Sequence, residues 1–335
     1  MPSPLAQAVR LLQAGELVAF PTETVYGLGA DAANPQAVAK IFAAKGRPAD
    51  HPLIVHLADA SHLTQWAIDI PPTAHALAEA FWPGPLTLIL PKAPAVPLAV
   101  TGGQQTVGLR VPAHPLALEL LQAYAQAGGG HGGLCGIAAP SANRFGRISP
   151  TEAAHVRDEL GSAVSLILDG GRCAVGIEST IIDLSRPAAP PRLLRPGHIT
   201  PAQIAAVIGI EPELPHPRKP GDTPRVSGSL DAHYAPRTPI RVATTAQLPE
   251  LMASLKNTGR NTALLAHTML GAALPAQTLR HLPDNAEAYA QGFYAALREL
   301  DEAHAELIVI EALPDNNAWS AIADRLRRAA CGAGM

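Results

Sequence analysis

The sequence predicts an α/β protein made of two domains that are joined by a linker. Three observations lead to this prediction. The chain has 335 residues, which is long for a single hydrophobic core. Residues 210–236 contain six prolines and no hydrophobic periodicity, as a linker does. From residue 237 to residue 335, apolar strand patterns alternate with amphipathic helix patterns, which favours a small open parallel sheet.

Composition and charge exclude several classes of protein. Hydrophobic residues make up 47% of the chain and charged residues 16%, which is typical of a folded globular protein rather than a disordered one. The formal net charge of −3 gives no overall attraction to nucleic acid or to an anionic membrane. The three scattered cysteines favour a reducing compartment and argue against a zinc site. The first ten residues lack a secretory apolar core, and prolines interrupt the most apolar run, 86–100, so we expect a cytoplasmic protein without a membrane contact.

Hydrophobic spacing and turn residues predict the elements of the first domain in chain order. Helices are expected at residues 5–14, 35–45, 60–67, 73–82, 115–125, 150–160 and 201–208. Strands are expected at residues 17–20, 52–57, 86–90, 106–111, 136–139, 164–168 and 181–184. Residues 149–152 and residues 200–203 both fit a capping box with proline at the first helical position.

The second domain is expected to alternate strictly between strand and helix. Strands are predicted at residues 239–243, 262–267 and 306–311. Helices are predicted at residues 248–256, 285–301 and 317–330. The longest of these helices places Tyr289, Phe293, Leu297 and Leu300 on one face, which should therefore be buried.

Two cations lie one residue apart at the end of the second helix. Asn34 and Pro35 begin this helix with a capping residue and a proline at the first position, and Gly46 ends it after Lys45. The Lys45 ammonium supplies a point charge and the Arg47 guanidinium a bidentate fork, a combination that suits a polyphosphate. Beside phosphates we expect the pKa of Lys45 to stay high.

Other polar residues have to be weighed against ordinary structural roles. Ser141 and Asn143 follow an apolar strand and sit where hydroxyl and amide groups would face a ligand. Arg110 lies inside a strand, where a solvent-facing position is the commoner arrangement. The glycine-rich stretch 128–133 is interpreted as a flexible loop. Residues 27–32 match the dinucleotide fingerprint only superficially, because the strand that should precede them directly is six residues away.

Six short motifs follow one another along the chain. They are Pro21-Thr22-Glu23-Thr24-Val25-Tyr26-Gly27-Leu28, Lys45-Gly46-Arg47-Pro48, Trp82-Pro83-Gly84-Pro85-Leu86-Thr87, Pro140-Ser141-Ala142-Asn143, Gly176-Ile177-Glu178-Ser179-Thr180 and Leu194-Arg195-Pro196-Gly197. With these motifs the chain resembles the Sua5/YrdC/YciO family, and over its whole length it resembles the two-domain Sua5 form. One such match would be weak, but six in order, followed by the element at residues 233–236, are specific.

The resemblance implies a fold and a division of the chain. Residues 1–208 would form a YrdC-type catalytic domain, a twisted mixed sheet with surrounding helices and a deep cavity. Residues 209–236 would be a proline-rich linker that lies over the cavity as a lid. Residues 237–335 would form the Sua5-type carboxyl-terminal domain, a small Rossmann-like parallel α/β unit.

The resemblance also implies an activity. The reaction would be that of a nucleotidyltransferase, which forms threonylcarbamoyl-AMP and pyrophosphate from L-threonine, bicarbonate and ATP. Mg²⁺ would accompany ATP, without a tightly bound metal site on the protein. The product would pass to the downstream t6A transferase machinery for modification of adenosine 37 in tRNA, and a transient contact with tRNA is compatible with the resemblance.

The matching motifs imply site residues as well. Those expected to bind L-threonine are Thr22, His56, Arg110, Ala139 and Ser179, with Arg110 pairing the carboxylate. Those expected to bind ATP are Lys45, Arg47, Thr106, Ser141, Asn143, Arg195, Ser227 and Tyr234. Catalysis would rest on Lys45, Arg47, Ser141 and Asn143 through positioning and charge stabilisation, in a dry cavity that protects the carbamate. Whether Ser227 or Ser229 of the linker reaches ATP stays open.

Two alternatives belong to other functional classes. A non-catalytic RNA-binding module would need interleaved aromatic and basic residues, which the sequence does not offer. A carbamoyl-transfer enzyme that uses carbamoyl phosphate would need added acylphosphatase and zinc-finger modules, and these 335 residues contain neither. Pyrophosphate release that requires threonine, bicarbonate and ATP together separates the three hypotheses.

Overall fold

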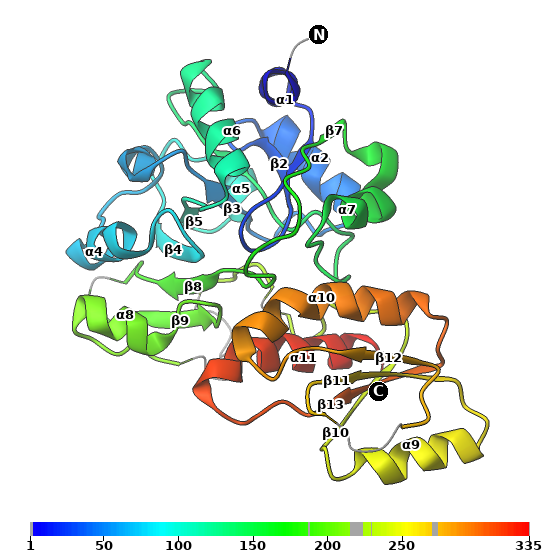
Figure 1. Cartoon of the computed structure of the whole chain (residues 1–335). Helices are drawn as coiled ribbons and strands as arrows, with labels where there is room; N and C mark the ends of the chain where they lie inside the picture. Colours follow the sequence, from blue (N-terminus) through cyan, green and yellow to red (C-terminus); the bar gives the residue numbers. More distant parts are fainter. Residues whose placement is uncertain (1–2, 187, 215–223, 229, 270–273, 335) are drawn as a thin grey trace. The chain divides into compact units, whose positions relative to one another are not determined.

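The computed structural model describes residues 3–186, 188–214, 224–228, 230–269 and 274–334 (Figure 1). Contacts within the chain divide it into two compact units. The first consists of Met1–Phe145, Pro150–Ala174 and Glu178–Ser229. The second consists of Gly146–Ser149, Val175–Ile177 and Leu230–Met335. Two short loops that precede the linker in the sequence, 146–149 and 175–177, therefore belong by their contacts to the second unit.

A nine-stranded sheet forms the centre of the first unit, in the order β7-β1-β2-β6-β3-β5-β4-β8-β9. Its strands are β1 (Val18–Phe20), β2 (Gly27–Asp31), β3 (Ile54–His56), β4 (Leu86–Pro91), β5 (Thr106–Arg110), β6 (Ile137–Ala138), β7 (Leu166–Ile167), β8 (Thr180–Asp183) and β9 (Arg192–Arg195). The sheet contains both parallel pairs, such as β3 with β5, and antiparallel pairs, such as β4 with β5, so the expected mixed sheet is confirmed. The sequence did not predict β2, because its residues, Gly-Leu-Gly-Ala-Asp, have low strand propensity.

Eight α-helices of the first unit lie in its described residues: α1 (Pro4–Gln13), α2 (Pro35–Lys45), α3 (Leu63–Trp66), α4 (Pro72–Phe81), α5 (Leu98–Thr101), α6 (Pro115–Gln126), α7 (Ala153–Leu160) and α8 (Pro201–Ile208). The Asn34 cap and the left-handed Gly46 that ends α2 are confirmed, and so is the capping box at Thr200. The capping box at Ser149 is wrong, because α7 begins at Ala153. The carbonyl groups of Pro150 and Thr151 instead accept hydrogen bonds from distant backbone amides, which keeps this stretch out of the helix.

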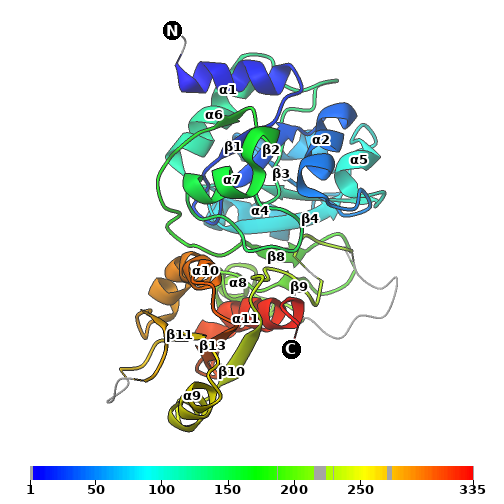
Figure 2. The same ribbon diagram turned by 90° about the vertical axis from the view of Figure 1, so that its right-hand side faces the viewer.

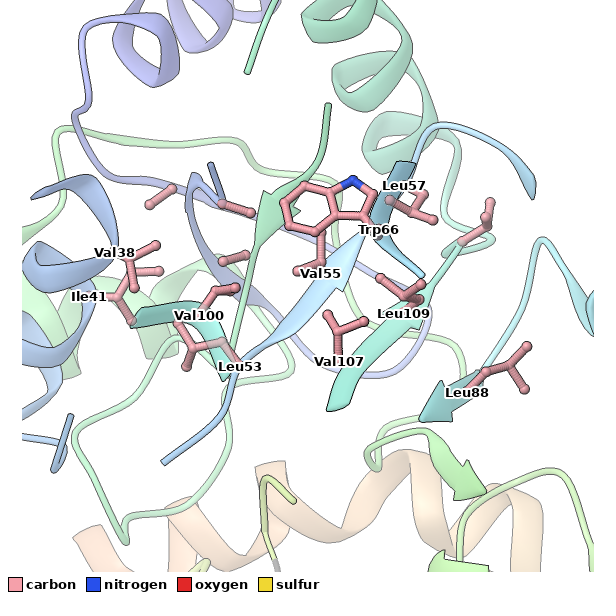
Figure 3. Close-up of a cluster of buried hydrophobic side chains, with 14 of the residues drawn as sticks. Val38, Ile41, Leu53, Val55, Leu57, Trp66, Leu88, Val100, Val107 and Leu109 are labelled. Carbon is pink, nitrogen blue, oxygen red and sulfur yellow. The ribbon is translucent and has the colours of Figure 1, made fainter. Parts of the chain in front are cut away.

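The two faces of the sheet carry different helices because neighbouring strand residues point in opposite directions. Val18 and Phe20 pack with α1 and α6, which lie side by side (Figure 2). Leu17 and Ala19 belong to the larger cluster on the other face, with side chains from α2, α3, α4 and α5. In that cluster the Trp66 indole lies beside the aliphatic side chains of the central strands (Figure 3).

The second unit has a four-stranded sheet in which every described pairing is parallel, in the order β10-β13-β11-β12. Its strands are β10 (Ile240–Ala243), β11 (Thr262–Ala266), β12 (Thr278–His281) and β13 (Leu307–Glu311). The helix α9 (Leu248–Asn257) covers one face, while α10 (Ala286–Glu302) and α11 (Ser320–Gly332) cover the other (Figure 1). The predicted parallel sheet and the buried face of α10 are confirmed. The edge strand β12 was not predicted, since its side chains are largely exposed and carry no core pattern.

None of the described helices combines the length and the apolar character that crossing a bilayer requires.

Candidate active site

Lys45 holds the turn that carries Ser141 and Asn143. It is the last residue of α2 and is only 3% exposed. Its Nζ donates hydrogen bonds to the carbonyl oxygen of Ser141, at 2.6 Å, and to that of Asn143. The amide of Phe145 in turn donates to the carbonyl oxygen of Lys45 at 2.8 Å. The two motifs, nearly a hundred residues apart in sequence, therefore form one local structure.

Arg47 projects from the same corner and contacts the segment of residues 224–227, which lies far along the chain. Its Nη2 donates to the carbonyl oxygen of Pro52 at 2.9 Å, and both terminal nitrogens lie 3.4 Å from the Ser227 hydroxyl. The guanidinium also lies over the Phe145 ring, 5.7 Å from its centroid. Cation–π and hydrogen-bond contacts thus fix its orientation.

Burial lowers the pKa of Lys45 well below its usual range, and the Arg47 charge lowers it further. This direction differs from the expectation that the pKa stays high. The physical reason is that the ammonium is buried beside another cation, while its described hydrogen-bond acceptors are carbonyl oxygens rather than carboxylates. A nearby anion would favour the charged form of Lys45.

Arg110 is buried and pairs with a residue that sequence reasoning did not single out. Its Nη2 lies 2.6 Å from a carboxylate oxygen of Glu23, its Nη1 donates to the Thr24 hydroxyl at 2.9 Å, and its Nε donates to the Gly84 carbonyl at 3.1 Å. The commoner solvent-facing arrangement is therefore wrong here. These contacts use three of the five N–H donors of the guanidinium. The one available signal for Glu23 was its place in the motif at residues 21–28.

His56 lies beside Arg110, because β3 pairs with β5 in the register that aligns these two residues. Burial, and then the Arg110 charge, lower the pKa of His56 to about 3, so the ring is neutral at physiological pH. Its ring meets Phe20 edge-on at 6.1 Å. The Ala139 amide donates to the carbonyl oxygen of Ile54, at the start of the same strand.

The Thr22 hydroxyl organises the loop before β2. It donates to the carbonyl oxygen of Val25 at 2.6 Å, accepts from the amides of Thr24 and Val25 at 3.2 Å, and lies 2.8 Å from the Thr24 hydroxyl. This is the local turn chemistry that threonine often provides. It fixes the loop that presents Thr24 to Arg110.

Arg195 connects Ser179 with Ser227. Its Nε and Nη2 donate to the carbonyl and hydroxyl oxygens of Ser179 at 3.0 and 3.1 Å, and its Nη1 donates to the carbonyl oxygen of Ser227 at 2.9 Å. The Ser179 hydroxyl also lies 2.8 Å from that of Thr87 on β4. Expected threonine-binding and nucleotide-binding residues thus share one hydrogen-bond network.

The segment of residues 224–227 packs against the sheet of the first unit. Val226 joins Ile89 and Ile181 in a small apolar cluster. Arg225 pairs with Asp50 at 2.7 Å, and its backbone exchanges two hydrogen bonds with the Gln104 side chain. A small pocket lies beside this segment, and its lining includes Thr106, Gly108 and Ser227.

Of the residues expected to bind ATP, Tyr234 belongs by its contacts to the second unit. It is buried and has a positive φ of 62°, and its ring lies near the ring of Tyr294 and the Arg325 guanidinium. Ser229, the alternative linker serine, lies outside the described residues. Of the two linker serines, Ser227 lies in the described residues, and its hydroxyl lies near Arg47.

The glycine-rich stretch 128–133 is anchored at two points. The His131 ring lies 2.6 Å from the carboxylate of Asp31, a residue at the end of β2, and the Gly130 amide donates to the Tyr124 hydroxyl at 2.9 Å. Within the described residues, no three His, Cys, Asp or Glu side chains gather as a set of metal ligands.

Two family models together match almost the whole chain. A model named Sua5_yciO_yrdC, described as telomere recombination, matches residues 10–197, and a model described as threonylcarbamoyl-AMP synthase, C-terminal domain, matches residues 199–331. The chain is 40% identical to a threonylcarbamoyl-AMP synthase of Pyrococcus abyssi over 331 residues, which are 96% of this chain and 92% of that protein. It is 42% identical to the Bacillus subtilis protein of the same name, over 98% of this chain and 93% of that one.

The solved structures agree with this result. The fold is similar to that of P. abyssi Sua5 complexed with L-threonine, with a TM-score of 0.88 and 39% identity, over 98% of this chain and 94% of that one. A variant of the same P. abyssi protein, in which a histidine and the tyrosine that follows it are both replaced by alanine, matches with the same TM-score.

Proposed function

This chain belongs to the Sua5/YrdC/YciO family in its two-domain Sua5 form, and we propose that it forms threonylcarbamoyl-AMP and pyrophosphate from L-threonine, bicarbonate and ATP. One observation carries the proposal furthest. The Lys45–Arg47 corner and the buried Arg110 lie in one unit of a chain that is 40–42% identical, over almost its full length, to enzymes of this name. A buried pair of cations suits a polyphosphate, and a buried arginine suits a carboxylate.

L-Threonine is proposed to bind around Arg110. Three of the five guanidinium donors are used by Glu23, Thr24 and Gly84, which leaves the fork further N–H groups for the substrate carboxylate. The neutral ring of His56 lies next to Arg110 and offers an uncharged surface to the substrate side chain. The proposed set is completed by Thr22, Ala139 and Ser179.

ATP is proposed to bind between the Lys45–Arg47 corner and the segment of residues 224–227. Lys45 and Arg47 take the phosphates, with Ser141 and Asn143 presented by the turn that Lys45 holds. The remaining contacts are proposed for Thr106, Arg195, Ser227 and Tyr234. Magnesium arrives as part of the MgATP substrate, since Mg²⁺ is commonly held by phosphates and water.

The chemistry follows from this placement. The threonine amine attacks bicarbonate or its CO₂ equivalent to form a carbamate, with loss of water when bicarbonate is the donor. A carbamate oxygen then attacks the α-phosphorus, forming a phosphorus–oxygen bond as the bond to pyrophosphate breaks. Charge develops on the departing pyrophosphate, where Lys45 and Arg47 can stabilise it. Because a carbamate loses CO₂ in water, exclusion of solvent matters more than a strong base.

We propose that residues 1–208 form the catalytic domain, residues 209–236 the linker and residues 237–335 the carboxyl-terminal domain. Within the linker, Arg225 pairs with Asp50, Val226 packs on strands β4 and β8, and Ser227 lies near Arg47, and these contacts with the first unit support a role as a lid. A lid of this kind retains an unstable intermediate until the next step.

The product is a mixed carbamic–phosphoric anhydride, so it needs an acceptor enzyme close by. We propose that the t6A transferase machinery consumes it in the cytoplasm and that contact with tRNA is transient. The test is a pyrophosphate-release assay in which threonine, bicarbonate and ATP are omitted one at a time. Release should require all three substrates, and mass spectrometry should detect threonylcarbamoyl-AMP. Release that is independent of threonine would contradict the proposal.

A further inference from the structure

We propose that helix α10 of the second unit positions two loops that carry substrate-binding residues of the first unit. The first loop is 146–149, three residues after Asn143, and the second is 175–177, two residues before Ser179. Both loops group with the second unit by their contacts. The inference rests on the proposed function, because it gives α10 a role in the same site.

Polar contacts hold the first loop. Arg298 of α10 is buried and donates to the carbonyl oxygen of Ile148. Arg147 lies 3.5 Å from the carboxylate of Asp301, near the carboxyl end of the same helix. The amide of Ala235 donates to the carbonyl oxygen of Gly146 at 2.9 Å.

Asp301 connects the first loop with the segment that leads into β10. Its carboxylate accepts hydrogen bonds from the backbone amide of Arg237, at 2.8 and 3.0 Å, and from that of Thr238, at 2.7 Å. One carboxylate on α10 therefore binds both the loop after the Ser141–Asn143 motif and the chain that follows the linker.

The second loop is held by close backbone packing. Gly176 has a φ of +81°, and a Cβ atom built there would lie 2.5 Å from Cα of Gln291 and 2.6 Å from the carbonyl oxygen of Ala290, both on α10. Neither is the end of a flexible side chain that could move aside. Any side chain at position 176 therefore has to push the loop away from the helix, and Ser179 follows three residues later.

The experiment compares two glycines of the connection between β7 and β8, Gly171 and Gly176, of which Gly176 alone packs closely against α10. Gly171 has a φ of +77° and open space where a Cβ atom would be, so Gly171→Ala reproduces the backbone strain without the collision. Gly176→Ala should raise the KM for threonine about tenfold or more beyond the effect of Gly171→Ala, because misplacement by about 1 Å is costly at a reacting centre. Equal KM values in the two folded variants would overturn the role of the second loop.

Arg298 tests the first loop independently. Arg298→Ala should raise the KM for ATP about tenfold, and Arg298→Lys, which can still donate to the Ile148 carbonyl, should recover most of the loss. Glu299→Ala is the control, since Glu299 is an exposed neighbour on α10 that pairs with Arg280. A purely structural arginine would lower the melting temperature of Arg298→Ala and leave the KM for ATP of the folded protein unchanged, which would overturn the proposal. A wild-type chain that forms no threonylcarbamoyl-AMP would instead overturn the proposed function.

Discussion

Each unit places buried charge at the ends of its strands or helices, but the two solutions differ. In the first unit Lys45 and Arg47 are neighbouring cations, and Lys45 contacts carbonyl oxygens. In the second unit the Glu311 carboxylate, at the end of β13, accepts four hydrogen bonds from Thr245, His267 and Thr268. These donors come from the chain after β10 and after β11, so Glu311 joins the ends of three strands.

The difference separates a binding arrangement from a structural one. Burial alone raises the pKa of Glu311, but the hydrogen bonds outweigh this effect and hold it below its usual range. At Lys45, burial and the neighbouring charge act in the same direction, against the charged form. A charge that the protein itself satisfies stabilises the fold, whereas a charge that is buried against another of the same sign favours binding of a counter-ion.

The strongest test of this comparison is removal of the cations. Lys45→Ala and Arg47→Ala should each lower kcat/KM about 100-fold or more, because they stabilise charge on the transferred phosphates. Arg47→Lys should also be poor, since a point charge cannot replace a fork. Lys40→Ala is the matched control, because Lys40 lies on the same helix but is exposed and pairs with Glu16. Near-normal turnover of Lys45→Ala would show that Lys45 does not belong to the active site.

Arg110 combines a binding role with a structural one, because it pairs with Glu23 and is proposed to bind the threonine carboxylate. Arg110→Ala should raise the KM for threonine about 30- to 1000-fold and change the KM for ATP far less. It should also lower the free energy of unfolding by about 3–5 kcal/mol, because the buried Glu23 carboxylate loses its partner. The double variant Glu23→Gln/Arg110→Ala should recover part of the stability and none of the threonine affinity. Unchanged dependence on threonine would show that Arg110 is structural alone.

Glu311 should show the opposite pattern to Lys45. Glu311→Gln keeps the shape of the side chain but loses its charge, and it should lower the free energy of unfolding by about 1–3 kcal/mol. The kcat/KM of the folded protein should stay within about twofold of the wild type. Glu299→Gln, at an exposed position, is the control for chemical denaturation. A large loss of kcat/KM in the fully folded Glu311→Gln variant would contradict the distinction.

The two groups should also respond to pH with opposite signs. The folded-state pKa of Glu311 is lowered. Its contribution to the stability of the fold is therefore complete above the unfolded pKa of 4.5 and is lost as the pH falls through the folded pKa. The folded-state pKa of Lys45 is lowered from 10.5, so its penalty is complete below the folded pKa and fades as the pH rises towards 10.5. In thermal unfolding, Glu311→Gln should therefore be less stable than the wild type by an amount that shrinks in acid. Lys45→Ala should lose the penalty of the buried charge, and this gain in stability should shrink in alkali. Differences that stay constant across both ranges would contradict these signs.

The smallest effect is expected in the segment of residues 224–227. The Arg225–Asp50 pair is about half exposed, so Arg225→Ala should cost about 1 kcal/mol or less in stability. If the segment acts as a lid, the same change should raise the KM for ATP about two- to fivefold. Arg241→Ala, an exposed arginine on β10, serves as the control. An unchanged KM for ATP would argue against the lid.

Local signals predicted much of this structure, and long-range pairings account for what was missed. The cap at Asn34 and the stop at Gly46 depend on neighbouring residues, so the Lys45–Arg47 corner could be predicted from the sequence. The pairing of Arg110 with Glu23 joins positions 87 residues apart, and no periodic pattern encodes such a contact. The capping pattern at Ser149 failed for a related reason, since distant amides bind the carbonyl groups of the residues that follow it.

The two loops held by α10 have a consequence for how such proteins can be recombined. The chain passes between the units five times, after residues 145, 149, 174, 177 and 229. A chimera that joins the part before the linker from one relative to the rest of the chain from another would therefore pair α10 with foreign loops. Residues 146–149 and 175–177 have to be inherited together with residues 230–335, although they precede the linker in the sequence. For this fold the unit of exchange is a set of contacts and not a continuous stretch of gene.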